Sequence, residues 1–100
     1  MSRRELVYSP LAQAEALEAA VYYEGEKPRL GDRFLAQLDA AVKRVEAQPY
    51  SWSKYLWRTR VCKMKRFPYG VVYRVHRDRL VVIAVADLRR KQGYWKDRLL

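Results

Sequence analysis

The spacing of apolar residues changes once along this chain, and that change decides what the chain can fold into. Between residues 10 and 47 apolar positions recur every three or four residues, as on one face of a helix. From Trp57 onward they recur every two residues, as on one face of a strand. This order predicts an α+β fold in which a helical hairpin covers one face of a mainly antiparallel sheet.

The first helix is predicted to begin just after Ser9. A serine side chain can cap the free N–H groups of a first turn, and Pro10 suits that turn because its missing N–H costs little there. Apolar residues three and four apart form the predicted buried face: Leu11, Ala14, Leu17 and Val21. Gly25 and Pro28 end this helix.

A second helix is predicted from residue 29 or 30 to Pro49, because the residue before a proline is pushed away from helical geometry. Its apolar stripe is Phe34, Leu38, Val42 and Val45. Two amphipathic helices joined by a short loop form an antiparallel hairpin whose stripes need a partner surface.

The second half predicts a sheet of about four to five strands. Residues 6–8 form a short strand, residues 67–70 a turn, and residues 80–86, apolar on both faces, the interior strand. In the strand from Trp57, Cys62 and Met64 alternate with Val61, Lys63 and Lys65. We therefore expect the sheet face away from the helices to carry the charge.

Charge is divided unevenly between the halves. Residues 1–46 carry seven Lys or Arg against eight Asp or Glu, whereas residues 47–100 carry fourteen against three, so the net charge of +10 belongs to the second half. No acidic residue lies between Glu46 and Asp78. A structured surface of this composition attracts polyanions.

Size and composition set further bounds. One hundred residues with 50% apolar content suit a single domain over residues 1–100. The longest apolar run is too short for a bilayer and no signal-type core opens the chain, so we expect a cytoplasmic protein without membrane contact. A lone Cys62 and a lone His76 predict no disulfide, metal site or cofactor.

After the interior strand, residues 87–98 alternate cations with large aromatics. At this point the chain resembles the RelE/ParE superfamily toxins of type II toxin–antitoxin systems, the plasmid stabilisation type. The matching pieces are Tyr22-Tyr23-Glu24, Gly31, Arg33-Phe34, Leu38-Asp39, Pro49, Arg66-Phe67-Pro68-Tyr69, Val72-Tyr73-Arg74, Ile83-Ala84-Val85, Arg89-Arg90, Tyr94-Trp95 and Arg98. They cover nearly the whole chain in order.

The resemblance implies a protein that inhibits growth when free and is silenced by an acidic antitoxin encoded by a neighbouring gene. One branch of the superfamily poisons DNA gyrase, and another contains ribosome-dependent mRNA endonucleases that need no metal. A non-toxic binding module of the same fold is a third alternative. The resemblance is compatible both with a homodimer and with a toxin–antitoxin hetero-oligomer.

The resemblance also implies site residues. Candidate catalytic residues are Lys63, Arg89 and Tyr94, and candidate target- or antitoxin-binding residues are Lys65, Arg66, Arg74, Arg90, Trp95 and Arg98. Tyr94 and Trp95 could equally cover a sheet edge. Gly70 stands where the nucleases tend to have Arg, and Asp87 where close relatives commonly have His. Losing a cation and gaining a carboxylate both oppose work on phosphates, so the sequence favours the gyrase-directed branch.

Overall fold

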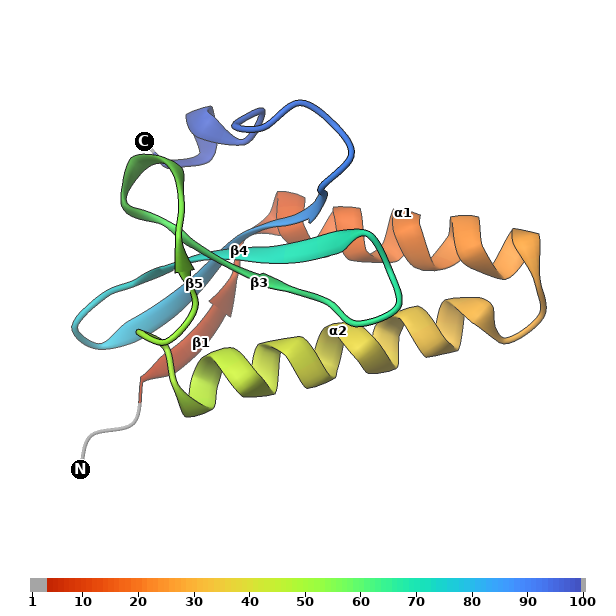
Figure 1. The fold of residues 1–100 in the computed structure, drawn as a ribbon, viewed down its shortest axis with the longest axis horizontal. Coiled ribbons are helices and arrows are strands. Elements are labelled where there is room, and N and C mark those ends of the chain that lie inside the picture. Colours follow the sequence, from red (N-terminus) through yellow and green to blue (C-terminus); the bar gives the residue numbers. More distant parts are fainter. Residues whose placement is uncertain (1–3, 100) are drawn as a thin grey trace.

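The computed structural model describes residues 4–99, which form two helices on one face of a five-stranded sheet (Figure 1). The elements in chain order are β1 (Glu5–Tyr8), α1 (Pro10–Glu26), α2 (Leu30–Ala47), β2 (Ser53–Lys54), the short 3-10 turn η1 (Leu56–Arg58), β3 (Arg60–Lys63), β4 (Tyr69–Val75), β5 (Arg79–Asp87) and η2 (Lys96–Leu99). The predicted α+β layering is confirmed.

The strands lie in the order β1-β5-β4-β3-β2, so the apolar strand β5 is interior, as expected. β1 pairs with β5 in parallel and every other pairing is antiparallel. The register between β4 and β5 shifts at Val72 and Tyr73, where Ile83 is left without a partner. Such a bulge bends and twists a sheet locally.

The helical hairpin is capped at both of its helix starts. The Ser9 hydroxyl accepts a hydrogen bond from the Ala12 N–H at 3.1 Å, as predicted. At the start of α2, Arg29 has a left-handed φ of 71° and its own side chain caps nothing. Instead the Glu24 carboxylate of α1 accepts the N–H groups of Arg29 (3.0 Å) and Gly31 (3.1 Å). One carboxylate thus ties the two helices together.

The buried face of α1 is not the predicted one. Its buried residues are Ala12, Ala16, Ala19 and Ala20, whereas Leu11, Leu17 and Val21 are 55%, 63% and 72% exposed. The reason is the closeness of α2: a Cβ on Gly31 would lie 2.5 Å from the Ala20 carbonyl oxygen. Only small side chains fit at so short a separation, so the larger apolar residues face outward.

The predicted stripe of α2 is buried as expected and forms the first core with Cys62, Met64 and Tyr73 of the sheet. At one end of this core, the rings of Tyr23, Phe34, Phe67 and Tyr69 meet with centroids 4.8 to 6.2 Å apart. Aromatic pairs at such separations add to the stabilisation that comes from burial alone.

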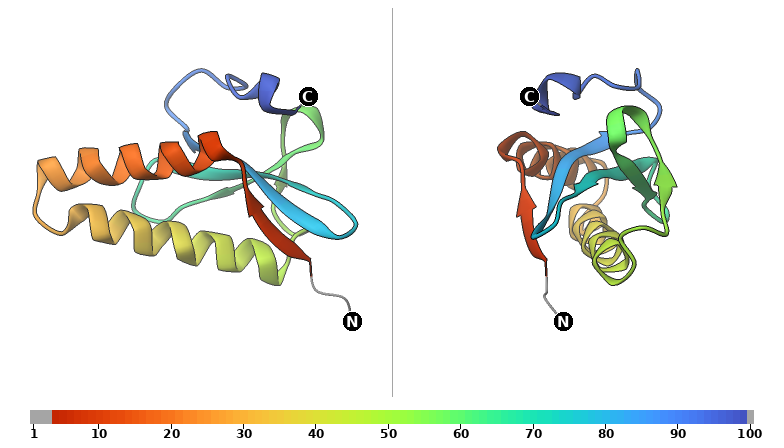
Figure 2. Two further views of the ribbon diagram at one scale, coloured as in Figure 1. Left: turned by 180° about the vertical axis from the view of Figure 1, so that it is seen from behind. Right: turned by 90° about the vertical axis from the view of Figure 1, so that its left-hand side faces the viewer.

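The sheet face away from α2 is also apolar, which corrects the expectation that it carries the charge. It holds a second core of Val61, Val72, Ile83, Ala84, Ala86 and Trp95. The C-terminal segment crosses this side of the sheet and supplies Trp95, which is 1% exposed (Figures 1 and 2). Lys63 and Lys65 stay exposed at its border.

The strand expected from Trp57 begins instead at Arg60. Trp57 (φ 53°, ψ 50°) and Arg58 (φ 62°) adopt left-handed conformations, which strands exclude. Trp57 lies so close to Gly93 that a Cβ there would be 2.7 Å from the indole, and Gly93 itself has a φ of 81°. A second boundary also differs, because Tyr69 and Gly70 belong to β4 and not to the preceding turn.

Two kinds of feature are absent from residues 4–99. None of the described helices is both long and apolar enough to cross a membrane. No group of three or more His, Cys, Asp or Glu side chains in the same part of the chain could hold a metal ion.

Candidate functional site: a cavity beside the C-terminal segment

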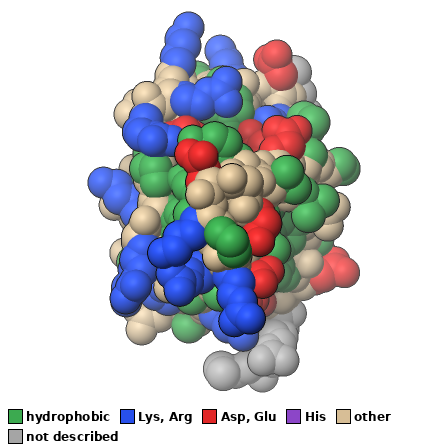
Figure 3. Space-filling view, turned by 90° about the vertical axis from the view of Figure 1, so that its right-hand side faces the viewer, with side chains coloured by type: hydrophobic (Ala, Val, Ile, Leu, Met, Phe, Trp, Pro, Cys, Tyr) green, Lys and Arg blue, Asp and Glu red, His purple; other side chains and the backbone are tan. Residues whose placement is uncertain are grey.

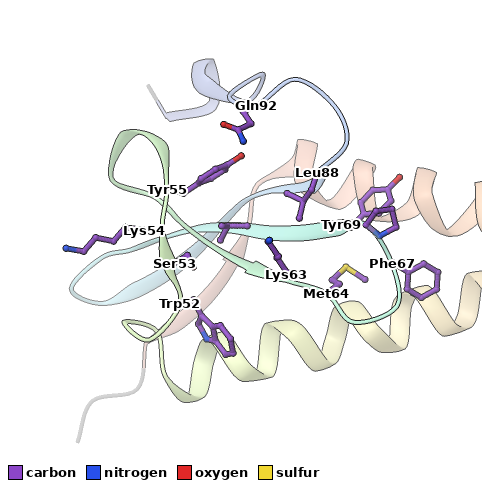
Figure 4. Close-up of a pocket in the computed structure, with 12 residues that line it drawn as sticks. Trp52, Ser53, Lys54, Tyr55, Lys63, Met64, Phe67, Tyr69, Leu88 and Gln92 are labelled. Atoms are coloured by element: carbon purple, nitrogen blue, oxygen red, sulfur yellow. The ribbon is translucent and has the colours of Figure 1, made fainter.

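A cavity of about 700 Å³ opens beside the C-terminal segment, between residues 52–55 and the junction of β3, β4 and β5 (Figure 4). Its lining residues are Trp52, Ser53, Lys54, Tyr55, Val61, Lys63, Met64, Phe67, Pro68, Tyr69, Leu88 and Gln92. Most of them are aromatic or aliphatic. Such a surface suits an apolar ligand or protein side chain more than a row of phosphates.

Lys63 is the cation that β3 presents to this cavity. Its ammonium group points toward the space bordered by Tyr55, Leu88 and Gln92, whereas the Lys54 side chain extends away from it (Figure 4). The described lining contains no carboxylate and no imidazole. Lys63 can therefore attract one anionic group, but the lining offers it no partner for exchanging a proton near neutral pH.

The position of Gly70 is closed by neighbouring side chains. Gly70 pairs with Lys63 on β3 and with Ala86 on β5. A Cβ added there would lie 2.8 Å from Val61 Cγ2 and 3.3 Å from the methyl groups of Leu88. A long cationic side chain therefore has no room at this point unless Val61 and Leu88 move.

Arg89, a candidate catalytic residue, is held by Asp87 and does not line the cavity. Its Nε and Nη2 donate to the two carboxylate oxygens at 3.0 and 2.9 Å, and its backbone N–H donates at 3.0 Å. The hydrogen-bonded guanidinium lowers the pKa of Asp87, which stays ionised at neutral pH. Asp87 thus neutralises the neighbouring cation.

Tyr94, the third candidate, is bound to Glu15 on α1. Its hydroxyl donates to one carboxylate oxygen, and Arg98 donates to both oxygens at 2.8 and 3.1 Å. Burial and, after it, this hydrogen bond raise the pKa of Tyr94. A tyrosine in this state stays protonated near neutral pH, and its proton is already donated to Glu15.

Glu15 is the residue that sequence reasoning missed. Besides Tyr94 and Arg98 it accepts the Val85 N–H at 3.1 Å, on the part of β5 that extends beyond β1. The sequence offers no indication of this role, because Glu15 stands inside a helix and its partners are 70 to 83 residues away.

The expected binding residues fall into two groups. Lys65, Arg66 and Arg90 are exposed and accessible, with Arg90 5.8 Å from the Tyr94 ring centre. The other three take part in packing, and the ring of Trp95 is buried in the second core. Arg98 lies in the ion pair with Glu15, and half-buried Arg74 donates to the Trp57 carbonyl oxygen.

Charges of opposite sign gather on different sides of the molecule. Viewed onto the closed end of the helical hairpin, Lys and Arg side chains cluster toward the left, whereas carboxylates lie among hydrophobic side chains in the middle and on the right (Figure 3). Helix α1 accounts for part of this separation, since it contains four glutamates and no Lys or Arg. The molecule therefore offers a basic surface and an apolar, acidic one.

Known proteins share this sequence pattern and fold. The model of the family described as ParE toxin of type II toxin-antitoxin system, parDE, matches residues 6–94. No curated protein matches the sequence. A solved chain from P. aeruginosa, described as a chromosomal ParDE TA system, has the same fold, with a TM-score of 0.74 over 83% of this chain and 94% of that chain at 15% identity. Because the family model spans nearly the whole sequence, the chain belongs to the ParE toxin family of type II toxin–antitoxin systems.

Proposed function

We propose that this toxin arrests growth by acting on DNA gyrase and not by cleaving messenger RNA. The observation that carries the proposal is the isolation of Lys63, which faces the cavity without a second catalytic group. Metal-independent RNA cleavage needs cations around the phosphate and groups that exchange protons. Here Arg89 is paired with Asp87, and Tyr94 donates to Glu15.

The cavity lining supports a protein target. Trp52, Phe67, Tyr69 and Leu88 present aromatic and aliphatic surface around a single ammonium group. Protein interfaces typically have such an apolar centre with a few polar anchors at its edge. In this proposal an apolar side chain of gyrase enters the cavity and Lys63 pairs with a nearby carboxylate.

The proposed regulator is an acidic antitoxin encoded by a neighbouring gene, which binds in the cytoplasm. The exposed cations Lys65, Arg66 and Arg90 attract its carboxylates. Its apolar residues cover the outward stripe of α1, whose Leu11, Leu17 and Val21 are otherwise in water. One partner with both kinds of residue can thus wrap around two sides of the toxin.

Inducible expression of the chain alone in a bacterium tests the toxin role, and two assays then separate the targets. We expect growth arrest, rescue by the neighbouring antitoxin, and accumulation of cleaved DNA when the purified protein meets gyrase and supercoiled DNA. Lys63→Met is expected to weaken gyrase poisoning, and Lys91→Met, at an exposed position outside the cavity lining, serves as its control.

Each alternative has its own result. Cleavage of messenger RNA on ribosomes, without any effect on gyrase, would replace the proposed target by the nuclease function. Unimpaired growth in cells that contain soluble protein would reject the toxin role and leave a binding module.

A further inference from the structure

A second cavity, of about 450 Å³, lies at the start of β3 and is separate from the proposed gyrase site except for the two residues that line both, Lys54 and Tyr55. Its lining residues are Tyr50, Lys54, Tyr55, Arg58, Thr59, Arg60 and Val75. Three of these are cations, and no described lining residue is acidic. The cavity therefore concentrates positive charge in a concave surface.

These cations have no carboxylate to neutralise them. None of the ion pairs in residues 4–99 involves Lys54, Arg58 or Arg60, and residues 47–77 contain no Asp or Glu at all. Arg60 is also held in place, because its Nη1 donates to the carbonyl oxygens of Tyr50 (3.1 Å) and Trp52 (2.8 Å). A fixed and unpaired guanidinium is well suited to an oxyanion.

Arg58 reaches the cavity through an unusual backbone. Trp57 and Arg58 are consecutive left-handed residues, a conformation that residues other than glycine rarely adopt. Thr59 secures it, since its hydroxyl donates to the Leu56 carbonyl oxygen at 2.6 Å and its own carbonyl oxygen accepts the Tyr55 N–H at 2.8 Å. Backbone strain that the surrounding structure enforces in this way clusters at binding sites.

The same turn exposes an aromatic ring, on the residue directly before Arg58. The Trp57 ring is 42% exposed although it packs edge-on against Trp95, and Lys96 Nζ lies 5.2 Å from its centre. Cations that follow a phosphate backbone beside an aromatic ring on which a base can stack are the usual means of holding single strands. An acidic peptide would satisfy the cations but has no need of the ring.

We propose that the cavity formed by Lys54, Arg58 and Arg60 binds a phosphodiester group of a single-stranded nucleic acid, with an adjacent base stacked on Trp57. DNA and RNA share this chemistry, and the 2′-hydroxyl is the group that can distinguish them. The site goes beyond the proposed gyrase function, because it concerns direct binding by the isolated toxin.

The test measures binding of the purified full-length chain to fluorescent single-stranded DNA and RNA of the same length at several salt concentrations. Lys54→Gln combined with Arg58→Asn removes two cations, and Asn tolerates the left-handed backbone at position 58. Lys27→Gln with Arg77→Asn makes the same charge change at exposed positions outside the cavity.

We expect the cavity variant to bind several-fold more weakly. The slope of log affinity against log salt is expected to fall by about 1.4, as for two lost phosphate contacts on a single strand. The control variant is expected to lose much less. Equal losses in both variants, or no binding by the unmodified chain, would overturn the proposal.

Two further measurements keep the result interpretable. Circular dichroism checks that the cavity variant is folded, and Lys54→Gln alone replaces it if it is not. Competition by polyglutamate as strong as competition by unlabelled oligonucleotide would make this an acidic-peptide site and reject the nucleic-acid assignment. Tighter binding to RNA or to DNA of the same length identifies which of the two the site prefers. These binding measurements use only the purified chain, so their results are independent of the gyrase and growth assays.

Discussion

Glu15 joins three parts of the molecule through a single carboxylate. It belongs to α1, and its oxygens accept hydrogen bonds from the Val85 N–H of β5 and from Tyr94 and Arg98 of the C-terminal segment. Its ion pair with Arg98 is largely buried, with side chains 18% and 15% exposed. Removing one member of such a pair leaves the other charge without a partner, which costs more than the pair contributes.

We therefore expect Glu15→Ala to lower the free energy of unfolding by about 2 kcal/mol, as for lost hydrogen bonds to a charged group. Urea unfolding measures the change, and limited proteolysis should show earlier cleavage after residue 87. Glu18→Ala, at an exposed carboxylate three residues further along α1, is the control and should change stability by less than about 0.5 kcal/mol. Similar losses in the two variants would show that Glu15 does not hold the segment.

Single residues could be predicted from the sequence where their partners are local. Ser9 was predicted correctly because its capping partner, Ala12, is three residues away. The roles of Glu15 and Trp95 depend on contacts between opposite ends of the chain, and no local pattern carries that information. Gly70 and Asp87 are unusual in the sequence itself, but the closure over Gly70 involves Val61 and Leu88, which are distant in the chain. The pairing of Asp87 with Arg89 is local, yet the sequence does not specify it because it depends on how an exposed side chain turns.

At the scale of elements, the hairpin of α1 and α2 depends on a close approach at Gly31. A Cβ there would meet the Ala20 backbone at 2.5 Å, whereas a Cβ on Gly25 would meet nothing within 4 Å. Both glycines are helical, so the two positions form a matched pair.

Gly31→Ala is expected to destabilise the protein by about 1–3 kcal/mol, because the helices must move apart. Gly25→Ala is expected to stabilise it by about 0.5–1 kcal/mol, since alanine loses less backbone freedom on folding. Thermal unfolding of the two variants measures both changes. Shifts of the same sign would contradict the close approach.

The orientation of α1 shows the limit of apolar spacing. This helix has apolar residues on two faces, and spacing alone favoured the face with the larger side chains. Packing against α2 and β5 selected the alanine face instead. The orientation of α2 was predicted correctly because only one of its faces is rich in large apolar residues.

The outward stripe of α1 gives a prediction for the proposed antitoxin. Leu17→Gln with Val21→Gln should change stability little, because both side chains are already exposed. If the antitoxin buries both, the loss is about 3 kcal/mol, roughly a hundredfold in affinity. Calorimetry with the neighbouring antitoxin and growth rescue in cells measure the effect. Unchanged affinity would place the antitoxin elsewhere.

For the whole molecule, the sheet lies between two cores. The change of apolar spacing predicted the helical layer and the sheet correctly. It did not predict the second core, because Val61 alternates with Cys62 and was assigned to a charged face with Lys63. The charge lies instead at the borders of the second core and on the turns.

Two tyrosines with raised pKa values, buried Tyr73 and partly exposed Tyr94, make stability depend on alkaline pH. Burial raises the pKa of Tyr73 from its ordinary 10.0 to about 12, and the pKa of Tyr94 is raised as well. The stabilisation is complete below the unfolded pKa and is lost as the pH rises through the folded pKa. The free energy of unfolding, measured with denaturant, should therefore decrease between about pH 10 and 12. The Tyr73→Phe variant should lose less of its free energy of unfolding over the same pH range. Parallel curves of the free energy of unfolding against pH for the variant and the unmodified protein would contradict this assignment.

The pairing of β1 with β5 orders events during synthesis. Residues 5–8 are made more than 70 residues before their hydrogen-bonding partners, residues 79–82. Strand β5 also joins β1 to the other three strands, so no nascent chain that lacks β5 contains the complete sheet. A ribosome that stalls before β5 releases a fragment without the toxin fold. The chain thus becomes able to act only after β5 has been made.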